Sequence, residues 1–425
     1  MTDAISRANA AVPAPTHDAH SSDPLRLGWM QGHPPALDKL VRFADGNHYR
    51  FPQSRWSFSH FRELGPTRAV RRGSSVAELP RAPRDDLDAL PFETLVTRQA
   101  MTWGQSLAAN FTDGIVVLHR GKVVFERYFG ALQPDDQHIA FSVTKSLVGL
   151  LAACLVHDGL LDEQAPVSHW VPELAGSAFA DATLRHLLDM TTGLDYSEDY
   201  ADPAAQIHQH ARAGGMLARE PGYAGPDSFY QYLQTVRPLG AHGRGFAYKT
   251  VNTDTLGWVI RRATGRGLAE LLSERLWQPL GAEQEAYFML DSHGTEFAGG
   301  GLNTALRDLA RVGEMMRLDG HFNGRQVVPA AVVADIRRGA DPAHFAQAGY
   351  ALLPGWSYRN MWWVTHNAHG AYCARGVHGQ LVYIDPSAEM VIARYASHPQ
   401  AANVHLDPTS LPAWAALAAH LRARP

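Results

Sequence analysis

The clearest pattern along the chain is an apolar run from Leu147 to Val156 that contains no charged side chain. Because the run is apolar on every side, it predicts a helix buried in a core rather than an amphipathic surface helix. Lys145 lies two residues before this run, and Ser142 lies three residues before Lys145. Positions i and i+3 of a helix share one face, so the Lys145 amine can reach the Ser142 hydroxyl.

Strand patterns occur near both ends of the chain. Residues 114–130 predict two β-branched strands around a turn at Arg120–Gly121. Residues 380–384 and 390–395 flank the turn Asp385–Ala388 and predict a second hairpin, and residues 411–424 predict an amphipathic closing helix. The middle of the chain is helical and rich in loops.

These patterns predict an α/β fold of two lobes. Residues 25–165 and 295–425 form the α/β lobe with the sheet, and residues 166–294 form a mainly helical inserted lobe. Residues 1–24 are rich in Ala, Pro, His, Ser and Asp and predict a disordered tail without the apolar core of a signal peptide. No run is long enough for a membrane span, so we expect a cytoplasmic protein.

Composition excludes several classes of protein. The chain is 45% hydrophobic and 19% charged, which is typical of a globular protein. A net charge of −4 with interspersed signs argues against a nucleic-acid partner. The only cysteines are Cys154 and Cys373, and Cys154 falls inside the buried run, so we expect a reducing compartment and no disulfide framework.

The placement of Lys145 favours catalysis. Only 4 of the 38 basic residues are lysines, and a lysine at the head of a buried helix costs several kcal/mol unless something offsets it. Burial lowers the pKa of an amine, so this lysine can accept a proton from Ser142. The spacing alone is a weak signal, because a serine three residues before a lysine arises often by chance.

Three polar and aromatic clusters accompany the pair: residues 195–203 (DYSEDYADP), 246–258 (FAYKTVNTDTLGW) and 372–380 (YCARGVHGQ). Each alone is compatible with an ordinary turn. Together with Ser142 and Lys145, they follow the order of elements in one enzyme superfamily. Residues 139–162, 246–258, 297–316 and 378–386 resemble the serine β-lactamase and penicillin-binding-protein superfamily. Within it, they resemble the class C-like branch that holds 6-aminohexanoate-dimer hydrolases, which act on nylon oligomers, and carboxylesterases.

The resemblance implies a β-lactamase-like fold, an antiparallel sheet flanked by helices, and specific roles. Ser142 would be the acylated nucleophile, Lys145 its proton acceptor, and Tyr248 the group whose phenolate or phenol shuttles the proton, with a nearby Lys145 favouring the phenolate. The N–H groups of Ser142 and Val377 would form the oxyanion hole. Further residues would contact substrate: Tyr200, Trp363, Ala211, His378, Gly376, Thr250 and Asn252.

Departures from the superfamily pattern bear on the substrate. Thr250 stands where an Asn is usual, with Asn252 two residues further on, and Ala374 stands where a Lys is usual if Gly376 is the motif glycine. The other register, His378–Gly379–Gln380, also lacks lysine. Ala211 falls where an Asp could hold a substrate ammonium. We therefore expect a hydrolase of short-chain esters, with linear amides such as 6-aminohexanoate oligomers cleaved slowly and β-lactams negligibly.

Alternatives remain. A β-lactamase or DD-peptidase would share the nucleophile, and a catalytically inactive binding protein would share the fold. An α/β-hydrolase is excluded because the chain has no Gly-x-Ser-x-Gly pentapeptide. His208 and His210 are two residues apart, which splits them across a helix, so we expect no metal and no cofactor. The expected partner is a small-molecule ester or amide, and the resemblance suggests a homodimer.

Overall fold

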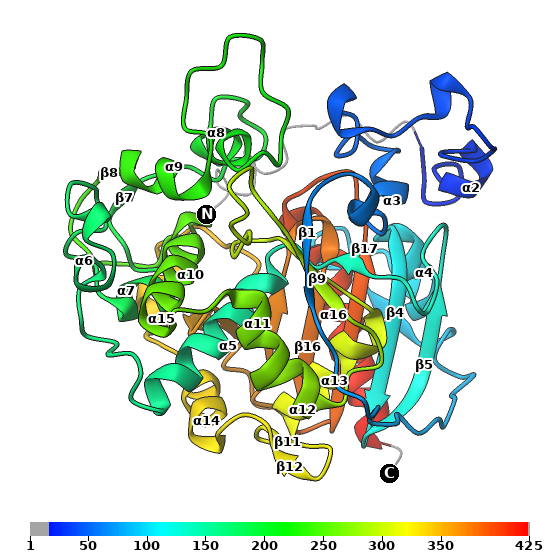
Figure 1. Ribbon diagram of the computed structural model, residues 1–425. Helices are drawn as coiled ribbons and strands as arrows, with labels where there is room; N and C mark the ends of the chain where they lie inside the picture. Colours follow the sequence, from blue (N-terminus) through cyan, green and yellow to red (C-terminus); the bar gives the residue numbers. More distant parts are fainter. Residues whose placement is uncertain (1–16, 424–425) are drawn as a thin grey trace.

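A seven-stranded antiparallel sheet is the largest unit of the computed structural model, which describes residues 17–423 (Figure 1). The strand order is β13-β14-β15-β16-β17-β4-β5. The strands are β4 (Thr112–His119), β5 (Lys122–Tyr128), β13 (Ser357–Arg359), β14 (Trp362–Val364), β15 (Tyr372–Arg375), β16 (Leu381–Asp385) and β17 (Met390–Ala396). Strands from the two ends of the chain pair where β17 meets β4, which confirms the expected α/β fold with an antiparallel sheet.

Both predicted hairpins are present. In the first, Arg120 (φ 53°) and Gly121 (φ 75°) connect β4 to β5, and positive φ at both central residues is what a two-residue turn between twisted strands requires. In the second, β16 pairs with β17 from Leu381–Arg394 to Asp385–Met390. All residues of β16 and β17 are buried, so both faces of the sheet are covered.

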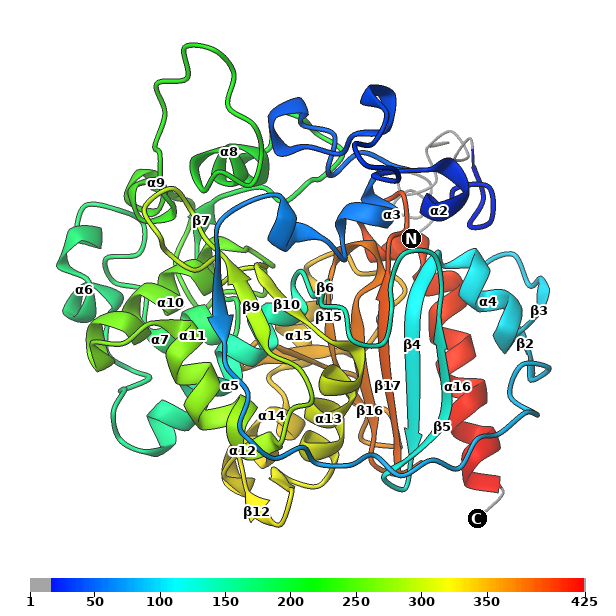
Figure 2. The same cartoon turned by 45° about the vertical axis from the view of Figure 1, so that its right-hand side comes forward.

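Helices on opposite faces cover this sheet (Figure 2). α13 (Leu306–Arg317) lies so close to one face that a Cβ on Gly313 would be 2.4 Å from Val391 Cγ1. α16 (Asp407–Ala423) covers the other face, where the rings of Trp414 and Tyr383 are 5.0 Å apart. The capping box of Thr102 and Gln105 begins α4 (Trp103–Ala109), which packs beside α16.

The closing helix starts earlier than its sequence pattern indicated. It begins at Asp407 rather than at Leu411, and Pro412 lies inside it. Pro412 has no N–H to donate to the carbonyl of Pro408, and that carbonyl instead accepts from the N–H of Leu95 at 2.8 Å. The bond with a distant loop therefore offsets the helical hydrogen bond that proline removes, and no local pattern reveals it.

The buried helix predicted at residues 147–156 is α5 (Val143–His157), in which Val143 to Leu155 are all buried. It packs between α10 and the sheet. Trp362 on β14 donates from Nε1 to the carbonyl of Ser146 at 3.0 Å, and Ser146 Oγ donates to the carbonyl of Met361 at 2.6 Å. These bonds fix the first turns of α5 against β14.

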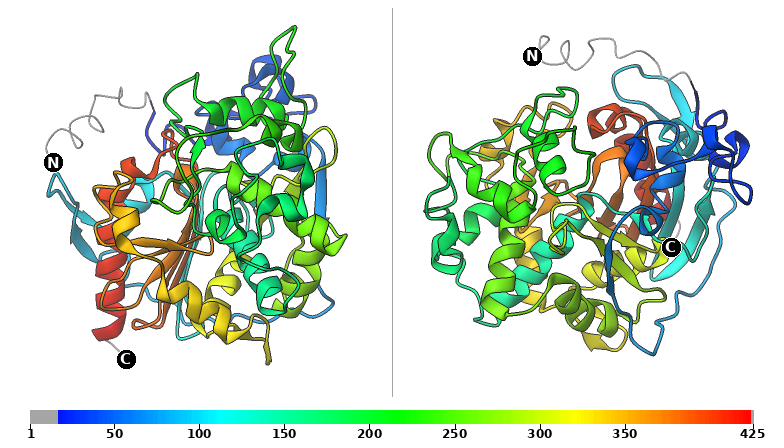
Figure 3. Two further views of the ribbon diagram at one scale, coloured as in Figure 1. Left: turned by 90° about the vertical axis from the view of Figure 1, so that its left-hand side faces the viewer. Right: turned by 45° about the horizontal axis from the view of Figure 1, so that its top comes forward.

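The middle of the chain contributes most of the remaining helices, which lie to one side of the sheet (Figure 3). They are α6 (Val167–Trp170), α7 (Leu184–Leu188), α8 (Gln206–Ala213), α9 (Phe229–Thr235), α10 (Val251–Thr264), α11 (Leu268–Leu272), the π-helical η5 (Ser273–Trp277) and α12 (Gln278–Leu280). α10 ends at Gly265, whose φ of 69° is the left-handed conformation common at helix ends. The division of the chain at residues 166 and 294 stays a prediction.

Smaller elements complete the described part of the chain. A four-stranded sheet has the order β1-β9-β10-β6, with β1 (Thr67–Val70), β6 (His138–Ile139), β9 (Ala286–Met289) and β10 (Leu302–Thr304). Three two-stranded pairs are β2 (Pro91–Glu93) with β3 (Ala100–Thr102), β7 (Leu194–Asp195) with β8 (Arg237–Pro238), and β11 (His321–Phe322) with β12 (Arg325–Gln326). Short helices are α2 (Pro24–Leu27), α3 (Ser54–Ser57), α14 (Ala330–Arg338) and α15 (Pro342–Ala346). Single 3-10 turns are η1 (Leu37–Lys39), η2 (Phe43–Asp45), η3 (Phe61–Glu63), η4 (Pro172–Leu174), η6 (Val377–Gly379) and η7 (Asn403–His405).

The N-terminal prediction needs a correction. Residues 1–16 lie outside the described residues, but residues 17–24 are not a disordered tail. Arg55 donates from Nη1 to the carbonyl of Ala19 at 2.6 Å and to Ser22 Oγ at 3.1 Å, and Ser22 is buried. Arg55 is distant in sequence, so the composition of the tail could not reveal this anchor. Among residues 17–423, no helix is both long and apolar enough to cross a membrane.

Candidate active site

Ser142 opens α5 and faces a cavity of about 560 Å³. The preceding residue, Phe141, has a φ of 43°, an uncommon conformation for a residue with a side chain and one that is often found at functional sites. The ring of Phe141 is held by aromatic contacts with Phe58 and His378. The cavity is lined by residues from separate segments, among them Ser142, Glu198, Tyr200, Tyr248, Tyr350, Trp363, Arg375, Gly376, Val377, Asn403 and Asp407.

Lys145 lies directly behind Ser142. Its Nζ is 2.8 Å from Ser142 Oγ and donates to the carbonyl of Gly299 at 2.5 Å. Lys145 is only 1% exposed, and desolvation lowers the pKa of its amine to about 8, against the opposing charges of Glu198 and Asp254. The amine is therefore neutral in a large share of molecules near pH 8, as proton transfer from a hydroxyl requires.

Tyr248 completes the group around the hydroxyl. Lys145 Nζ is 5.2 Å from the centre of its ring, and the ring stacks on Trp363 with centroids 5.5 Å apart. Burial, and then the charge of Glu198, raise the pKa of Tyr248, while its hydrogen bond with Ser142 lowers it. The net direction is upward, so the neutral phenol is favoured at rest. Of the two forms expected to carry the proton, the phenol is the one that this environment favours before the reaction.

The end of β15 brings Gly376 and Val377 against the start of α5. A Cβ on Gly376 would lie 2.8 Å from the carbonyl oxygen of Ala140 and 3.0 Å from the nitrogen of Ser142, so this close approach needs glycine. Within residues 17–423, neither the N–H of Ser142 nor that of Val377 has a hydrogen-bond acceptor. Two unpaired N–H groups next to the hydroxyl have the composition of an oxyanion hole.

The two registers of the third motif differ in their position relative to the cavity. Ala374–Arg375–Gly376 ends at the cavity, where Arg375 and Gly376 are lining residues. In the other register, His378 bonds from Nδ1 to the carbonyl of His398 at 2.7 Å, and the Gln380 amide donates to the carbonyl of Ala396 at 2.7 Å. Both of these side chains support the backbone, and neither lines the cavity.

Of the residues predicted to contact substrate, Tyr200, Trp363 and Gly376 line the cavity, and four others do not. His378 is one of the four. Thr250 is buried, and its Cγ2 lies against Gly299. Asn252 accepts from Thr192 Oγ1 at 2.8 Å, also away from the cavity. Ala211 lies in α8, and its carbonyl accepts from the N–H of Met216 at 2.7 Å. None of these four residues lines the cavity, and a direct substrate contact at them stays a prediction, because motif spacing gives a position in the chain but not the direction of a side chain.

Two charged features of the cavity were missed from the sequence. The Glu198 carboxylate accepts from the N–H of Thr250, and burial raises its pKa against the lowering effect of Lys145. Arg375 donates to Asp407, and its guanidinium lies 5.5 Å from the Trp363 ring centre. A fixed cation therefore does line the cavity, one residue after Ala374. Both residues fall in the polar clusters recognised in the sequence. The neighbouring residues are typical of turns, so the sequence did not indicate that these two side chains point into the cavity.

A second buried lysine follows Tyr248 in the sequence. Lys249 Nζ donates to the carbonyls of Thr192 at 3.2 Å and Leu194 at 2.7 Å, and desolvation lowers its pKa to about 8. Lys249 makes no contact with Ser142, so a Lys249 variant is a control for the effect of the Lys145 amine on the reaction. Among the residues that the structure describes, no group of three or more His, Cys, Asp or Glu side chains is placed to hold a metal ion.

Comparison with known proteins connects this site to one family. The Beta-lactamase family profile matches residues 105–410. The 6-aminohexanoate-dimer hydrolase of Paenarthrobacter ureafaciens is 37% identical over 349 residues, which span 82% of this chain and 86% of the relative. Esterase EstB of Burkholderia gladioli is 30% identical over 208 residues, 45% of this chain and 52% of the relative. A solved Bacillus anthracis structure, provisionally named 6-aminohexanoate-dimer hydrolase, is 32% identical with a TM-score of 0.83 and covers 92% of this chain and 100% of its own.

Proposed function

The chain belongs to the beta-lactamase family of serine hydrolases, and from that premise we propose that it cleaves short-chain carboxylic esters through an acyl-enzyme on Ser142. The observation that carries the proposal is the 2.8 Å contact between Lys145 Nζ and Ser142 Oγ at the wall of an open cavity. The similarity to esterase EstB supports the ester substrate.

The proposed reaction has two halves. The neutral Lys145 amine accepts the Ser142 proton while Oγ attacks the ester carbonyl carbon, and the N–H groups of Ser142 and Val377 stabilise the oxyanion. Tyr248, a phenol at rest, donates its proton to the leaving alkoxide and recovers one from Lys145. In the second half, water attacks the acyl-enzyme carbonyl and gives up a proton to Lys145. That proton then passes to Ser142 Oγ as the bond between Oγ and the acyl carbon breaks, which releases the carboxylic acid and restores Ser142.

Glu198 favours a second candidate activity, the hydrolysis of linear amides that end in an ammonium group. The sequence indicated no charge for such a substrate, because Ala211 stands where an Asp was expected. Glu198 lines the cavity and supplies a negative charge from a different segment. An ammonium paired with a carboxylate avoids the cost of several kcal/mol that an unpaired buried cation carries. The relative from Paenarthrobacter ureafaciens, named for such a dimer, supports this candidate.

We expect poor turnover of β-lactams. The arginine that lines the cavity is Arg375, and its guanidinium is bound to the buried carboxylate of Asp407. A substrate carboxylate would compete with Asp407, which is already in place, so Arg375 is a weak anchor for the carboxylate of a penicillin.

A panel of three substrates tests the proposal: p-nitrophenyl acetate, the linear 6-aminohexanoate dimer and nitrocefin. We expect efficient cleavage of the ester, measurable cleavage of the dimer and negligible cleavage of nitrocefin. Comparable turnover of nitrocefin and the ester would contradict the proposal. A protein that neither cleaves an ester nor reacts with a fluorophosphonate would be the inactive binding protein considered from the sequence.

A further inference from the structure

Asp254 connects the middle of the chain to the amine of Lys145. It lies in the first turn of α10, its side chain is 2% exposed, and its Oδ1 accepts from the N–H of Gly299 at 2.9 Å. The carbonyl of Gly299 accepts in turn from Lys145 Nζ at 2.5 Å. One residue, Gly299, therefore joins the carboxylate of Asp254 to the amine behind Ser142, although Asp254 itself does not line the cavity that holds Ser142.

The fit around Gly299 is close. A Cβ at this position would lie 2.4 Å from Thr250 Cγ2 and 2.8 Å from Asp254 Oδ2. A side chain there would push α10 away from the loop that carries the carbonyl. The close packing of α10 against Gly299 therefore fixes the contacts of Gly299 with both Asp254 and Lys145.

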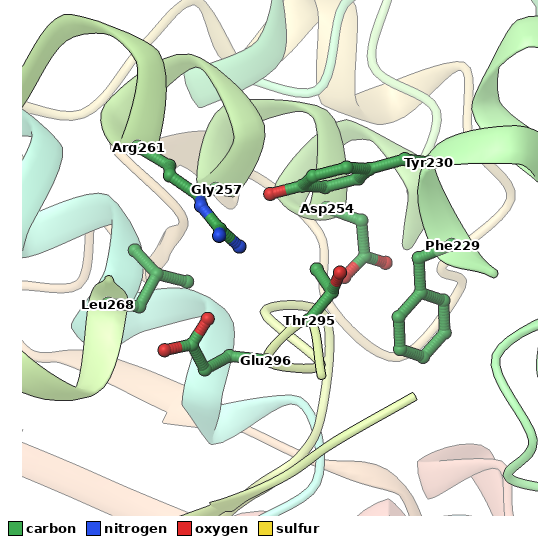
Figure 4. A pocket seen from close by; sticks show the side chains of 8 residues that line it. All are labelled: Phe229, Tyr230, Asp254, Gly257, Arg261, Leu268, Thr295 and Glu296. Carbon is green, nitrogen blue, oxygen red and sulfur yellow. The ribbon is translucent and has the colours of Figure 1, made fainter. Parts of the chain in front are cut away.

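The second oxygen of Asp254 has no aligned hydrogen-bond partner among the described residues, and Asp254 borders a small void. Asp254 Oδ2 lies 3.3 Å from Nε2 of the buried His210, but the two atoms are not aligned for a hydrogen bond. Figure 4 shows the Asp254 side chain on the wall of this void, with Tyr230, Arg261, Thr295 and Glu296 around it. Glu296 is paired with Arg68 at 2.9 Å. A carboxylate held by one aligned bond retains a field that acts on neighbouring charges.

Four side chains face the Lys145 amine: Ser142 and Tyr248 at the cavity, and the charged Glu198 and Asp254. The two carboxylates oppose the effect of burial on the pKa of Lys145. Glu198 stands in the cavity, where a substrate can screen or pair with it. Asp254 stands behind the amine, where a bound substrate does not reach it.

We propose that Asp254 is a positioning residue, which holds Lys145 against Ser142 through Gly299 and uses its charge to tune the basicity of the amine. The inference rests on the proposed function, in which Lys145 is the proton acceptor. The conservative variant Asp254→Asn separates the two effects, because the amide oxygen can still accept from the Gly299 N–H while the charge is lost. Asp254→Ala removes both.

The test follows Lys145 by two independent measurements. For Asp254→Asn, the midpoint of the rise of kcat/KM with pH should fall by at least about half a pH unit, because a charge that favours the ammonium is gone. Since the chain has 4 lysines, NMR of ¹³Cε-labelled lysine follows each amine, and the Lys145 resonance should titrate at the same lower pH. For Asp254→Ala, kcat should fall about tenfold or more at every pH with little change in KM.

Glu296→Gln is the matched control, since Glu296 lines the same void and does not contact Gly299; its midpoint should equal that of the wild type. An unchanged Lys145 titration in a folded Asp254→Asn variant would overturn the inference, even if Ser142→Ala is inactive. Full activity of Ser142→Ala would instead overturn the proposed function, so the two failures are distinguishable.

Discussion

Gly376 and Ser142 meet so closely that a methyl group on the glycine would lie 3.0 Å from the Ser142 nitrogen. The same methyl group would be 2.8 Å from the carbonyl oxygen of Ala140, which is rigid backbone. Any side chain at position 376 must therefore move the end of β15 away from the start of α5. The pair of N–H groups proposed to stabilise the oxyanion depends on this contact.

We expect Gly376→Ala to lower kcat for p-nitrophenyl acetate by about 10²-fold, the usual effect of losing one oxyanion donor. Steady-state kinetics and a thermal unfolding scan check this together. The control is Gly176→Ala, since a Cβ at Gly176 would contact nothing within 4 Å, and it should leave kcat unchanged. A Gly376→Ala enzyme with wild-type kcat would argue that Val377 does not contribute a donor.

The rate should depend on pH through the Lys145 amine. Because burial lowers the pKa of Lys145 to about 8, kcat/KM should rise with pH with a midpoint near 8, as the ammonium loses its proton. Lys249 has a pKa lowered to the same value but no contact with Ser142, so Lys249→Gln should retain the midpoint. If the midpoint near pH 8 disappeared in Lys249→Gln, the titration would belong to Lys249 and not to Lys145.

The same shifts affect stability. Between pH 8 and the pKa of a free lysine, about 10.4, the unfolded chain binds protons that the folded chain does not. The free energy of unfolding should therefore rise with pH across that window, and Lys145→Met should reduce the slope. Urea unfolding at pH 8 and pH 10 measures the change of the free energy of unfolding with pH. If this change were the same in Lys145→Met as in the wild type, the buried amine would not be titrating.

Lys145 and Tyr248 should behave as one unit of proton transfer. Residues that act together give a double variant scarcely worse than the worse single one. We expect Lys145→Ala and Tyr248→Phe each to reduce kcat/KM severely, and the double variant to lie within about tenfold of the worse single variant. Fully multiplicative losses would mean that the two side chains act in separate steps.

Glu198 should matter more for a cationic substrate than for a neutral one. At pH 9.5, above the Lys145 midpoint, Glu198→Gln should lower kcat/KM for the 6-aminohexanoate dimer at least about tenfold more than for p-nitrophenyl acetate, the equivalent of one charged contact. Asp199→Asn and Asp202→Asn are controls, because both carboxylates are exposed and neither lines the cavity. Equal losses on the two substrates would remove Glu198 as the ammonium partner.

The elements that the sequence predicted correctly are those whose conformation depends on neighbouring residues. The hairpin at Arg120–Gly121 and the buried helix after Ser142 follow from periodicity, and both are present. The sequence pattern placed the start of α16 too late. Pro412 fits inside the helix because the N–H of Leu95, in a distant loop, donates to the carbonyl of Pro408 in place of the N–H that proline lacks. The three-residue spacing of Ser142 and Lys145 gave the pair, since a helix fixes that geometry.

Pairings between distant segments could not be read in the same way. Arg375 and Asp407 are 32 residues apart, and the motif that holds Arg375 gives no sign of this partner. Glu198 lies among several carboxylates, and only the fold shows that it, rather than Asp199 or Asp202, lines the cavity. The neutral phenol favoured at Tyr248 follows from burial and then from the charge of Glu198, and burial of a single tyrosine is not a sequence property.

The central claim is that Ser142 becomes acylated, and intact-mass spectrometry with a fluorophosphonate probe tests it most directly. We predict one adduct per chain, located on the peptide that holds Ser142. In a folded Ser142→Ala variant we predict no adduct and no ester turnover. An adduct on another residue, or a Ser142→Ala variant that keeps more than about a tenth of wild-type turnover, would contradict it.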